Sequence, residues 1–368
     1  MIPVSEPLLD ERALSYVEEA VRTGWISSEG RFIAEFERRW AAYCGAAHGV
    51  AVCNGTVALE LAMAALGLPA DSEVILPSFT IISCAAAVLR TGCRPVLVDC
   101  DSDTWCLDVG EVRRKITAKT RAVMPVHIYG HMADMDPLME LAREFDLAII
   151  EDAAEAHGGE YHGRRAGGIG AMGCFSFYAN KIVTTGEGGM IVTSDAKLAE
   201  RARSLRNLAF RRDKRFLHTE IGYNFRITNL QAAIGLAQVE QIEDHLNRKR
   251  QMAARYHERL HAVEGIRLPI ERPHVKNVYW MYALVLEDWI PMDAAAFGAR
   301  LKEQGIDTRP FFLGMHEQPV LRELGLFAGE SYPVTERIAR RGLYLPSGLG
   351  LNESDIDRVC EAVKRCLA

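Results

Sequence analysis

The sequence predicts an α/β fold, a mostly parallel sheet with helices on both faces, and two observations carry this prediction. First, short apolar runs that are typical of buried strands alternate with helix-like stretches through the middle of the chain. Second, 49% of the 368 residues are hydrophobic and 25% are charged, as in an ordinary globular enzyme with room for two domains. We expect a large α/β domain over residues 1–240 and a smaller C-terminal α+β domain over 241–368.

The elements of the large domain follow from local patterns. Six apolar runs are expected to be strands: EVILP (73–77), RPVLVD (94–99), RAVMPVH (121–127), LAIIEDA (147–153), MGCFSFY (172–178) and GGMIVTS (188–194). Helices are expected at 10–22, 31–43, 56–66, 80–91, 108–115 and 134–145. The helix at 56–66 is apolar nearly all round, so we expect it to be buried.

The pattern changes after residue 195. A long helical stretch is expected to begin near Thr228, because Thr228 and Gln231 fit a capping box and apolar residues continue at heptad-like spacing to Leu260. Residues 277–287 (NVYWMYALVLE) are expected to form a strand. Helices are expected at 292–304 and 353–366.

Charge and cysteine content exclude several classes of function. The net charge is −6 and the pI is about 6.0, so no basic surplus indicates nucleic acid or an anionic membrane as a partner. The apolar runs are shorter than a membrane span of about 20 residues, and we expect no secretion signal. Nine cysteines without a C-x-x-C pair favour buried thiols, with no metal site, in a cytoplasmic protein.

The first segment that could carry chemistry is CNGTVALEL (53–61), in which Gly55 and Thr56 open a helix. A helix N-terminus binds phosphate, because its free N–H groups and the positive end of its dipole face the anion. An ordinary helix capped by Asn54 or Thr56 explains the same residues.

The second segment, IIEDAAEAHGG (149–159), is a hydrophobic strand that ends directly in Glu-Asp. Ligands of parallel sheets bind at the carboxyl ends of strands, so Asp152 is well placed to meet a cationic group. A strand-end carboxylate also serves as a helix cap, and the segment alone does not decide between the two roles.

The third segment, residues 174–192, places Lys181 between an aromatic-rich strand and a glycine-bearing loop. A lysine near apolar walls has a lowered pKa and can form a Schiff base. The alternative is a solvated loop lysine, which describes most lysines.

Other motifs carry less weight. Gly168, Gly170 and Gly173 match G-x-G-x-x-G, but a strand rather than a helix follows them, so we discount a dinucleotide site. His127 and His131 have the i, i+4 spacing of metal ligands, but Gly130 lies between them and no H-E-x-x-H is present. We interpret both histidines as strand-end residues.

A phosphate-binding helix start, an acidic strand end and a Schiff-base lysine, in this order, suit pyridoxal phosphate. The chain resembles the fold-type I aminotransferases, above all the DegT/DnrJ/EryC1/StrS branch that makes amino sugars from nucleotide-linked keto sugars. The resemblance covers essentially the whole chain. It is carried by TGWISSEGRFIAEFE (23–37), NGT (54–56), LPSFT (76–80), PVHIYG (125–130), EDAAEAHG (151–158), FSFYANK (175–181), TGEGGM (185–190), GYNFRITNLQAAIGLAQ (222–238) and TRPFF (308–312).

The resemblance implies a seven-stranded sheet and roles around the cofactor ring. Lys181 is expected to form the Schiff base and to move the proton, and Asp152 to pair with the pyridine nitrogen. Phe79 is expected to lie against the ring face and Glu155 near the ring hydroxyl. Some relatives are dehydratases with His in place of the lysine, so Lys181 favours transamination.

The resemblance also implies how the cofactor phosphate is held. Gly55, Thr56 and Ser176 are expected to bind it within one subunit. Asn224 is expected to reach the phosphate of the neighbouring subunit, so we expect a homodimer with its active sites at the subunit interface.

The implied reaction has two halves: L-glutamate gives up its amino group, and the C4 keto group of a nucleotide-linked 4-keto-6-deoxy sugar receives it. MIPVSEPLLDE at the start, Glu155 where many relatives carry Gln, and GIDTRPFFLGMHEQP (305–319) resemble the branch that aminates GDP-4-keto-6-deoxy-D-mannose. The amino sugar that this reaction makes is expected to enter a surface polysaccharide of O-antigen type. The candidate sugar contacts, for which inter-domain packing is the alternative, are Trp25, Ser27, Arg309, Phe311 and His316.

A nucleotide diphosphate needs a local basic patch on this acidic chain. Arg211, Arg212, Lys214 and Arg215 would supply one, although a solvated loop is the commoner explanation. Three other functions stay open: an aminotransferase for the 3- or 4-position of a UDP- or dTDP-linked keto sugar, a non-catalytic cofactor-binding regulator, and a nicotinamide dehydrogenase. The regulator would need an added DNA-binding domain, and the dehydrogenase rests only on the glycine motif.

Overall fold

A seven-stranded sheet forms the centre of the molecule in the computed structural model, which describes residues 1–211 and 213–368. The strand order is β1-β9-β8-β5-β4-β2-β3. Only β9 runs against its neighbours, so the expected mostly parallel sheet is confirmed. The strands are β1 (His48–Val52), β2 (Glu73–Pro77), β3 (Arg94–Val98), β4 (Thr120–Val123), β5 (Ala148–Asp152), β8 (Met172–Ser176) and β9 (Gly189–Thr193).

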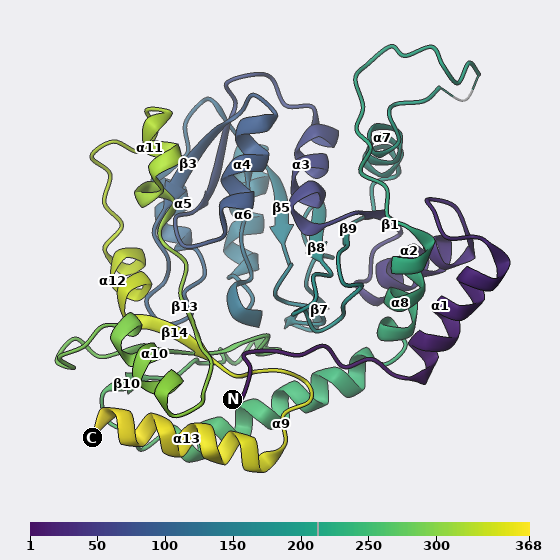
Figure 1. Ribbon diagram of the computed structural model, residues 1–368. Coiled ribbons are helices and arrows are strands. Elements are labelled where there is room, and N and C mark those ends of the chain that lie inside the picture. Colours follow the sequence, from purple (N-terminus) through teal and green to yellow (C-terminus); the bar gives the residue numbers. More distant parts are fainter. Residues whose placement is uncertain (212) are drawn as a thin grey trace.

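Helices cover both faces of this sheet (Figure 1). Every strand and helix predicted between residues 10 and 194 forms, although the strands at 121–127 and 172–178 are shorter than predicted. Helix α3 is buried as expected, because it packs against α4, β8 and β9. The helices are α1 (Glu11–Thr23), α2 (Arg31–Tyr43), α3 (Gly55–Leu66), α4 (Ile82–Arg90), α5 (Val109–Lys115), α6 (Met135–Phe145) and α7 (Ala196–Arg206), with the short 3₁₀ turn η1 (Ile128–Gly130).

The expected long helix from Thr228 to Leu260 is two helices, α8 (Asn229–Val239) and α9 (Ile242–Leu260). The predicted capping box of Thr228 and Gln231 is present at the start of α8. The prediction of one continuous helix is wrong, because the break is held by contacts from distant segments. Gln241 donates to Asp10 Oδ2 at 2.8 Å, and Glu240 pairs with Arg12 at 3.1 Å.

The C-terminal region carries a four-stranded antiparallel sheet in the order β10-β12-β14-β13. The strand predicted at 277–287 is shorter in the structure, and α11, α12 and η2 had no predicted counterpart. The elements are β10 (Ile266–Arg267), β12 (Tyr282–Leu286), β13 (Arg309–Pro310), β14 (Gly342–Leu345), α10 (Ala294–Glu303), η2 (Met315–Glu317), α11 (Pro319–Glu323), α12 (Pro333–Arg341) and α13 (Glu353–Leu367). A third, small sheet joins β6 (Glu160–Tyr161), β7 (Arg164–Arg165) and β11 (Val275–Lys276).

Hydrophobic packing crosses the boundary expected between residues 240 and 241. Trp280 and Phe311 belong to the core that surrounds the large sheet, whereas Ile2 packs into the core beneath α9 and α13. The N-terminal segment runs between these two parts of the molecule (Figure 1). Ile2 donates its N–H to Gly305 O at 2.8 Å, and Val4 O accepts from Ser347 N at 2.7 Å. The two-domain division therefore stays a prediction.

A buried lysine on α9 joins segments of the C-terminal region. Lys249 Nζ donates to Trp280 O at 2.6 Å and also to Ser347 O. Burial lowers the pKa of Lys249 to about 7. An amine that donates to two backbone carbonyls fixes the course of the chain at Trp280, which lines the active-site cavity.

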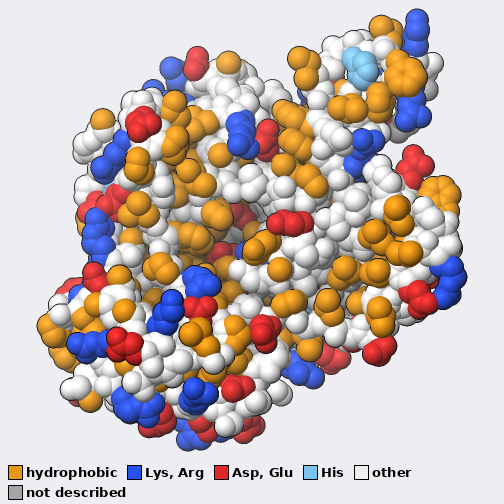
Figure 2. All heavy atoms as spheres, in the orientation of Figure 1, with side chains coloured by type: hydrophobic (Ala, Val, Ile, Leu, Met, Phe, Trp, Pro, Cys, Tyr) orange, Lys and Arg blue, Asp and Glu red, His pale blue; other side chains and the backbone are white. Residues whose placement is uncertain are grey.

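A loop between α7 and α8 projects from the body of the molecule (Figure 1). It carries exposed apolar side chains, with Phe216 83% and Ile221 93% exposed. Figure 2 shows hydrophobic and basic side chains gathered on this projection. Within the described part of the chain, no helix is long and apolar enough to span a bilayer.

Asn229, at the start of α8, ties the segment between α1 and α2 to the core. Its side chain accepts from Phe32 N at 3.1 Å and donates to Trp25 O at 2.7 Å. Its own N–H donates to Ser27 O at 2.6 Å. Asn229 is fully buried, so no water replaces these partners.

Replacing Asn229 by Leu is therefore expected to destabilise the protein by about 2 kcal/mol, because the buried Phe32 N–H and the partly buried Trp25 C=O lose their partners. Urea denaturation followed by circular dichroism measures the effect. Asn352→Ala, which removes the exposed cap of α13, is the control and is expected to cost about 1 kcal/mol. Equal losses in the two variants would contradict the role of Asn229.

Candidate active site

A cavity of about 700 Å³ lies at the carboxyl ends of β5 and β8. Figure 2 shows this face of the molecule hollowed between the part with the large sheet and the C-terminal part. Both parts supply walls. The large sheet and its loops contribute Asn54, Gly55, Thr56, Thr80, Ile81, Ser83, Asp152, Glu155, Ser176, Tyr178, Asn180 and Lys181, and the C-terminal part contributes Trp280, Phe312 and Tyr344.

The start of α3 forms one end of the cavity. Asn54 caps the helix, since its side chain accepts from Val57 N at 3.0 Å. The N–H groups of Gly55 and Thr56 have no acceptor within the helix and face outward. A Cβ on Gly55 would lie 2.5 Å from Ser176 Cβ, so glycine is required for this close approach. Backbone donors and the hydroxyls of Thr56 and Ser176 thus gather at one point, which suits an anion.

Asp152 ends β5 on the floor of the cavity. Its Oδ2 accepts from the Cys84 thiol at 3.1 Å, and its Oδ1 accepts from Ala154 N at 3.1 Å. Thr80 Oγ1 lies 3.3 Å from Cys84 Sγ. These contacts fix the orientation of the carboxylate and leave lone pairs on both oxygens for a cationic ligand.

Lys181 stands opposite, within the loop that joins β8 to β9. Its Nζ lies 3.7 Å from the centre of the Trp280 ring and 4.0 Å from Glu155 Oε1. Burial lowers the pKa of Lys181, while the charges of Glu155 and Asp152 oppose that shift. The amine is therefore more nucleophilic at neutral pH than a solvated lysine.

Contacts on both sides hold the lysine loop in place. Trp280 Nε1 donates to Asn180 O at 2.8 Å. Val183 N donates to His157 Nδ1 at 3.2 Å. Burial lowers the pKa of His157 to about 3, so the ring is neutral and Nδ1 is free to accept.

Glu155 is a buried carboxyl between Lys181 and Tyr129. Burial raises the pKa of Glu155 to about 7, although Lys181 and the Tyr129 N–H favour its charged form. Tyr129 N donates to Glu155 Oε2 at 2.8 Å. Tyr129 has a positive φ of 51°, a conformation that non-glycine residues adopt at a cost, so the turn is held to aim this N–H.

The donor set fits pyridoxal phosphate. An anion cradle, a carboxylate for a protonated pyridine nitrogen and a buried amine for an aldehyde lie around one cavity. Among the residues that the structure describes, no three His, Cys, Asp or Glu side chains gather closely enough to hold a metal ion.

The sequence pattern of the DegT/DnrJ/EryC1/StrS aminotransferase family matches residues 7–364. The chain belongs to this family. Proteins of this family are pyridoxal phosphate-dependent aminotransferases.

Individual relatives of the DegT family match along most of the chain. A GDP-perosamine synthase of Caulobacter vibrioides is 44% identical, covering 100% of this chain and 98% of the relative. One of Escherichia coli O157:H7 is 38% identical, covering 98% and 97%. A dTDP-3-amino-3,4,6-trideoxy-alpha-D-glucose transaminase of Streptomyces venezuelae is 39% identical, covering 89% and 85%. The crystal structure of the aminotransferase TlmJ from Streptoalloteichus hindustanus aligns with a TM-score of 0.93 at 32% identity, covering 100% and 99%.

The structure brings most of the predicted cofactor residues of this DegT family member to one cavity. Gly55, Thr56, Asp152, Glu155, Ser176 and Lys181 all line it. Phe79 does not: it is fully buried, and its ring packs on Phe311 at 5.4 Å and on Phe312 at 6.0 Å. Ile81, two residues further on, lines the cavity instead.

The predicted sugar contacts lie outside this cavity of the single chain. Phe311 and His316 are buried, 5% and 2% exposed. Trp25, Ser27 and Arg309 are exposed, and Arg309 pairs with Asp307 at 2.8 Å. The sugar-binding roles of these residues stay predictions.

Asn224 and the basic run also lie away from the cavity. Asn224 is exposed, and its Oδ1 accepts from Arg226 Nε at 2.9 Å. In the projecting loop, Arg211 pairs with Asp213 at 2.6 Å, and Arg215 lies 5.2 Å from the centre of the Phe210 ring. Arg212 lies outside the described residues.

Sequence reasoning missed several residues of the site. Trp280 lies within a predicted strand. Its contact with Lys181 joins residues that are distant in sequence, so no local sequence pattern predicts it. Cys84 lies in a helix whose alanine-rich sequence hides its contact with Asp152. Phe312 and Tyr344 come from the C-terminal region, and only the TRPFF motif marked the first of them.

Glu155→Gln is expected to lower the pKa of Lys181 further. Above pH 7 the Glu155 carboxylate favours the proton on Lys181, and glutamine removes that charge. The apo-protein should therefore react with trinitrobenzenesulfonate at Lys181 at a lower pH than the wild type, as measured by peptide mass spectrometry over a pH series. Glu160→Gln, whose carboxylate pairs with Lys276, should leave the curve in place. A midpoint that stays or rises in Glu155→Gln would contradict the pairing.

Proposed function

We propose that this chain transfers the amino group of L-glutamate to the C4 keto group of GDP-4-keto-6-deoxy-D-mannose and so makes GDP-perosamine. The observation that carries the proposal is one cavity in which the buried amine of Lys181 faces Asp152 beside the start of α3. Two relatives that are named GDP-perosamine synthase and match along nearly their whole length support the choice of sugar.

We assign pyridoxal phosphate as the cofactor. When bound, it carries the amino group between the two substrates and withdraws electrons from the carbon that loses a proton. Asp152 is assigned to the pyridine nitrogen, because its carboxylate oxygens can accept a hydrogen bond from a protonated nitrogen. Glu155 is assigned to the ring hydroxyl, and Ile81 lines the cavity where Phe79 was expected.

The phosphate is assigned to the N–H groups and hydroxyls of Gly55, Thr56 and Ser176. Asn224 is exposed and does not reach the cavity of its own chain. We therefore propose a homodimer in which the partner subunit's Asn224 completes the phosphate site. The assembly is assigned to the cytoplasm, where nucleotide sugars are made.

Lys181 is assigned the proton transfers. Its Nζ takes the proton from the α-carbon of glutamate, and in the second half it delivers a proton to C4 of the sugar. The lowered pKa of Lys181 leaves the amine free to accept a proton. Trp280, Phe312 and Tyr344 line this space, and we assign their rings the role of excluding water once substrate is bound.

A dTDP-linked keto sugar aminated at C3 is the second candidate substrate. The relative from Streptomyces venezuelae, which is named for a dTDP-3-amino sugar, supports it at 39% identity. The two candidates differ in the nucleotide and in the carbon that is aminated, so product analysis separates them.

The purified protein is expected to show a visible absorbance band that L-glutamate bleaches and GDP-4-keto-6-deoxy-D-mannose restores. Lys181→Ala should lose at least about 10³-fold in kcat, because it removes the group that moves the proton. Lys197→Ala on the exposed face of α7 is the control and should keep full activity. Recovery of the band with a dTDP keto sugar alone would discard the GDP sugar, and full activity of Lys181→Ala would discard the mechanism.

Charge reversal in the projecting loop tests the basic patch. Lys214→Glu with Arg215→Glu is expected to raise the KM for the nucleotide sugar about fivefold, because charge steers the diphosphate. The KM for glutamate and the kcat should not change. Lys302→Glu on α10 controls for net charge. An unchanged KM for the nucleotide sugar in steady-state assays would rule the patch out.

A further inference from the structure

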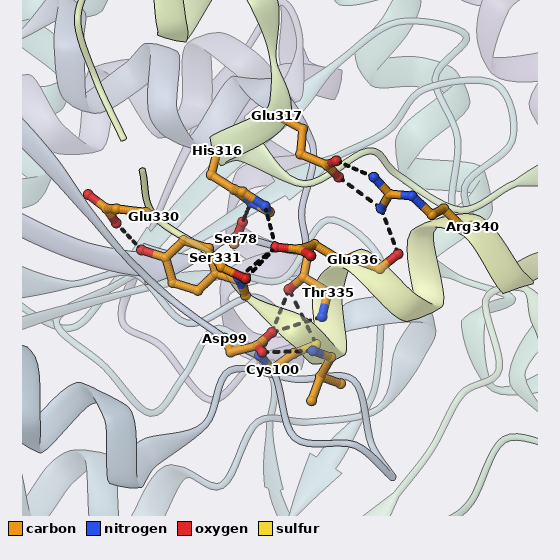
Figure 3. A network of polar contacts seen from close by, with 12 residues as sticks. Ser78, Asp99, Cys100, His316, Glu317, Glu330, Ser331, Thr335, Glu336 and Arg340 are labelled. Atoms are coloured by element: carbon orange, nitrogen blue, oxygen red, sulfur yellow. Dashed lines mark hydrogen bonds and ion pairs between the residues drawn. The ribbon is translucent and has the colours of Figure 1, made fainter. Parts of the chain in front are cut away.

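We propose that His316 is a positioning residue that joins two walls of the active-site cavity and so sets the affinity for the nucleotide sugar without touching it. Figure 3 shows His316 between Ser78, at the end of β2, and Glu336, on α12. The kinetic part of this inference rests on the proposed function, but the structural part does not.

His316 makes one hydrogen bond on each side of its ring. Its Nδ1 lies 2.8 Å from Ser78 Oγ, and its Nε2 lies 3.2 Å from Glu336 Oε1. Hydrogen bonds from Tyr332 N and the Ser331 hydroxyl lower the pKa of Glu336. Glu336 Oε1 accepts, which places a proton on Nε2, and in this tautomer Nδ1 accepts from the Ser78 hydroxyl.

The hydrogen bond between Ser78 and His316 joins two segments that both line the cavity. Ser78 leads directly into Thr80 and Ile81, which line the cavity. On the other side, His316 ends the segment that carries Phe312, also a wall residue. A second bond, from Met315 N to Ser78 O at 2.8 Å, runs parallel to the first. These two hydrogen bonds of Ser78, with His316 and with Met315, therefore set the distance between the wall from the large sheet and the wall from the C-terminal region. We call this pair of hydrogen bonds the clamp.

Glycines make room for the His316 ring and for the segment before it. A Cβ on Gly314 would lie 2.7 Å from His316 Cε1, and one on Gly342 would lie 2.2 Å from the Phe311 ring. Helix α12, which His316 contacts through Glu336, is also attached to the large sheet. Asp99, after β3, accepts from Thr335 N and from the Thr335 hydroxyl at 2.9 and 2.7 Å. Figure 3 shows this second attachment of α12 beside the first.

The Ser-His-Glu order resembles a hydrolase triad, but burial excludes that role. Ser78 has no exposed surface, so no substrate carbonyl reaches its hydroxyl. His316 is 2% exposed, which also excludes direct contact with a sugar in this arrangement. The bonds of His316 therefore act through the segments they join.

Two isosteric variants separate the two bonds. His316→Asn places an amide oxygen near the position of Nδ1 in the wild type and so keeps an acceptor for Ser78. His316→Gln places its amide near the position of Nε2 and so keeps the contact with Glu336. Ser78→Ala removes the same bond as His316→Gln from the other side. Arg340→Met breaks the exposed pair of Arg340 with Glu317 in the same network and is the control.

The measurements are amide hydrogen exchange of residues 309–317 and steady-state kinetics of the holoenzyme. In His316→Gln and Ser78→Ala, exchange of this segment should quicken and the KM for GDP-4-keto-6-deoxy-D-mannose should rise about tenfold. The kcat and the KM for glutamate, a much smaller substrate, should stay within about twofold. His316→Asn and Arg340→Met should behave as the wild type in both measurements.

The outcomes separate this inference from the proposed function. Unchanged exchange in His316→Gln and Ser78→Ala would overturn the clamp, whether or not the protein is an aminotransferase. Faster exchange with an unchanged KM for the sugar would overturn its effect on affinity. A raised KM in His316→Asn and His316→Gln alike, without faster exchange, would indicate direct contact instead. A wild type that does not respond to glutamate refutes the proposed function, while the exchange data still judge the clamp.

Discussion

Burial of three ionisable groups at one edge of a parallel sheet is the constraint on which the rest of the site depends. Asp152, Glu155 and Lys181 are all removed from water, and a buried charge is costly unless partners compensate it. The Cys84 thiol, the Tyr129 N–H and the Trp280 ring are those partners. The left-handed turn at Tyr129 is local strain accepted to keep one of these groups satisfied.

The partners that compensate these buried groups come from both the N-terminal and the C-terminal parts of the chain. Side chains therefore pack across the domain boundary expected between residues 240 and 241. Trp280 covers Lys181 from the C-terminal region, and Lys249 holds the backbone of Trp280. His316 holds the opposite wall to the end of β2. The large sheet therefore supplies the polar groups of the cavity, while the C-terminal region supplies the aromatic rings that line it.

Local patterns predicted the elements well and the long-range contacts poorly. The buried strands and α3 were predictable because apolar runs and helix caps are local. Strand β1 was missed, since its five residues gain their order from pairing with β9. The break between α8 and α9 has no Gly or Pro, so only contacts such as Glu240 with Arg12 reveal it. Lys181 and Asp152 were identified from ordered motifs, whereas the burial of His316 depends on Ser78 and Glu336, which are distant in sequence.

The N-terminal segment has a consequence for how the chain reaches its native state during synthesis. Ile2 and Val4 are synthesised long before their backbone partners, Gly305 and Ser347. The large sheet can form on the ribosome while this segment waits without partners, and contacts of such high sequence separation form late. The contacts of this segment are therefore expected to form last. A chain halted before residue 305 would contain a nearly complete large sheet, but residues 2–4 would lack their hydrogen-bond partners.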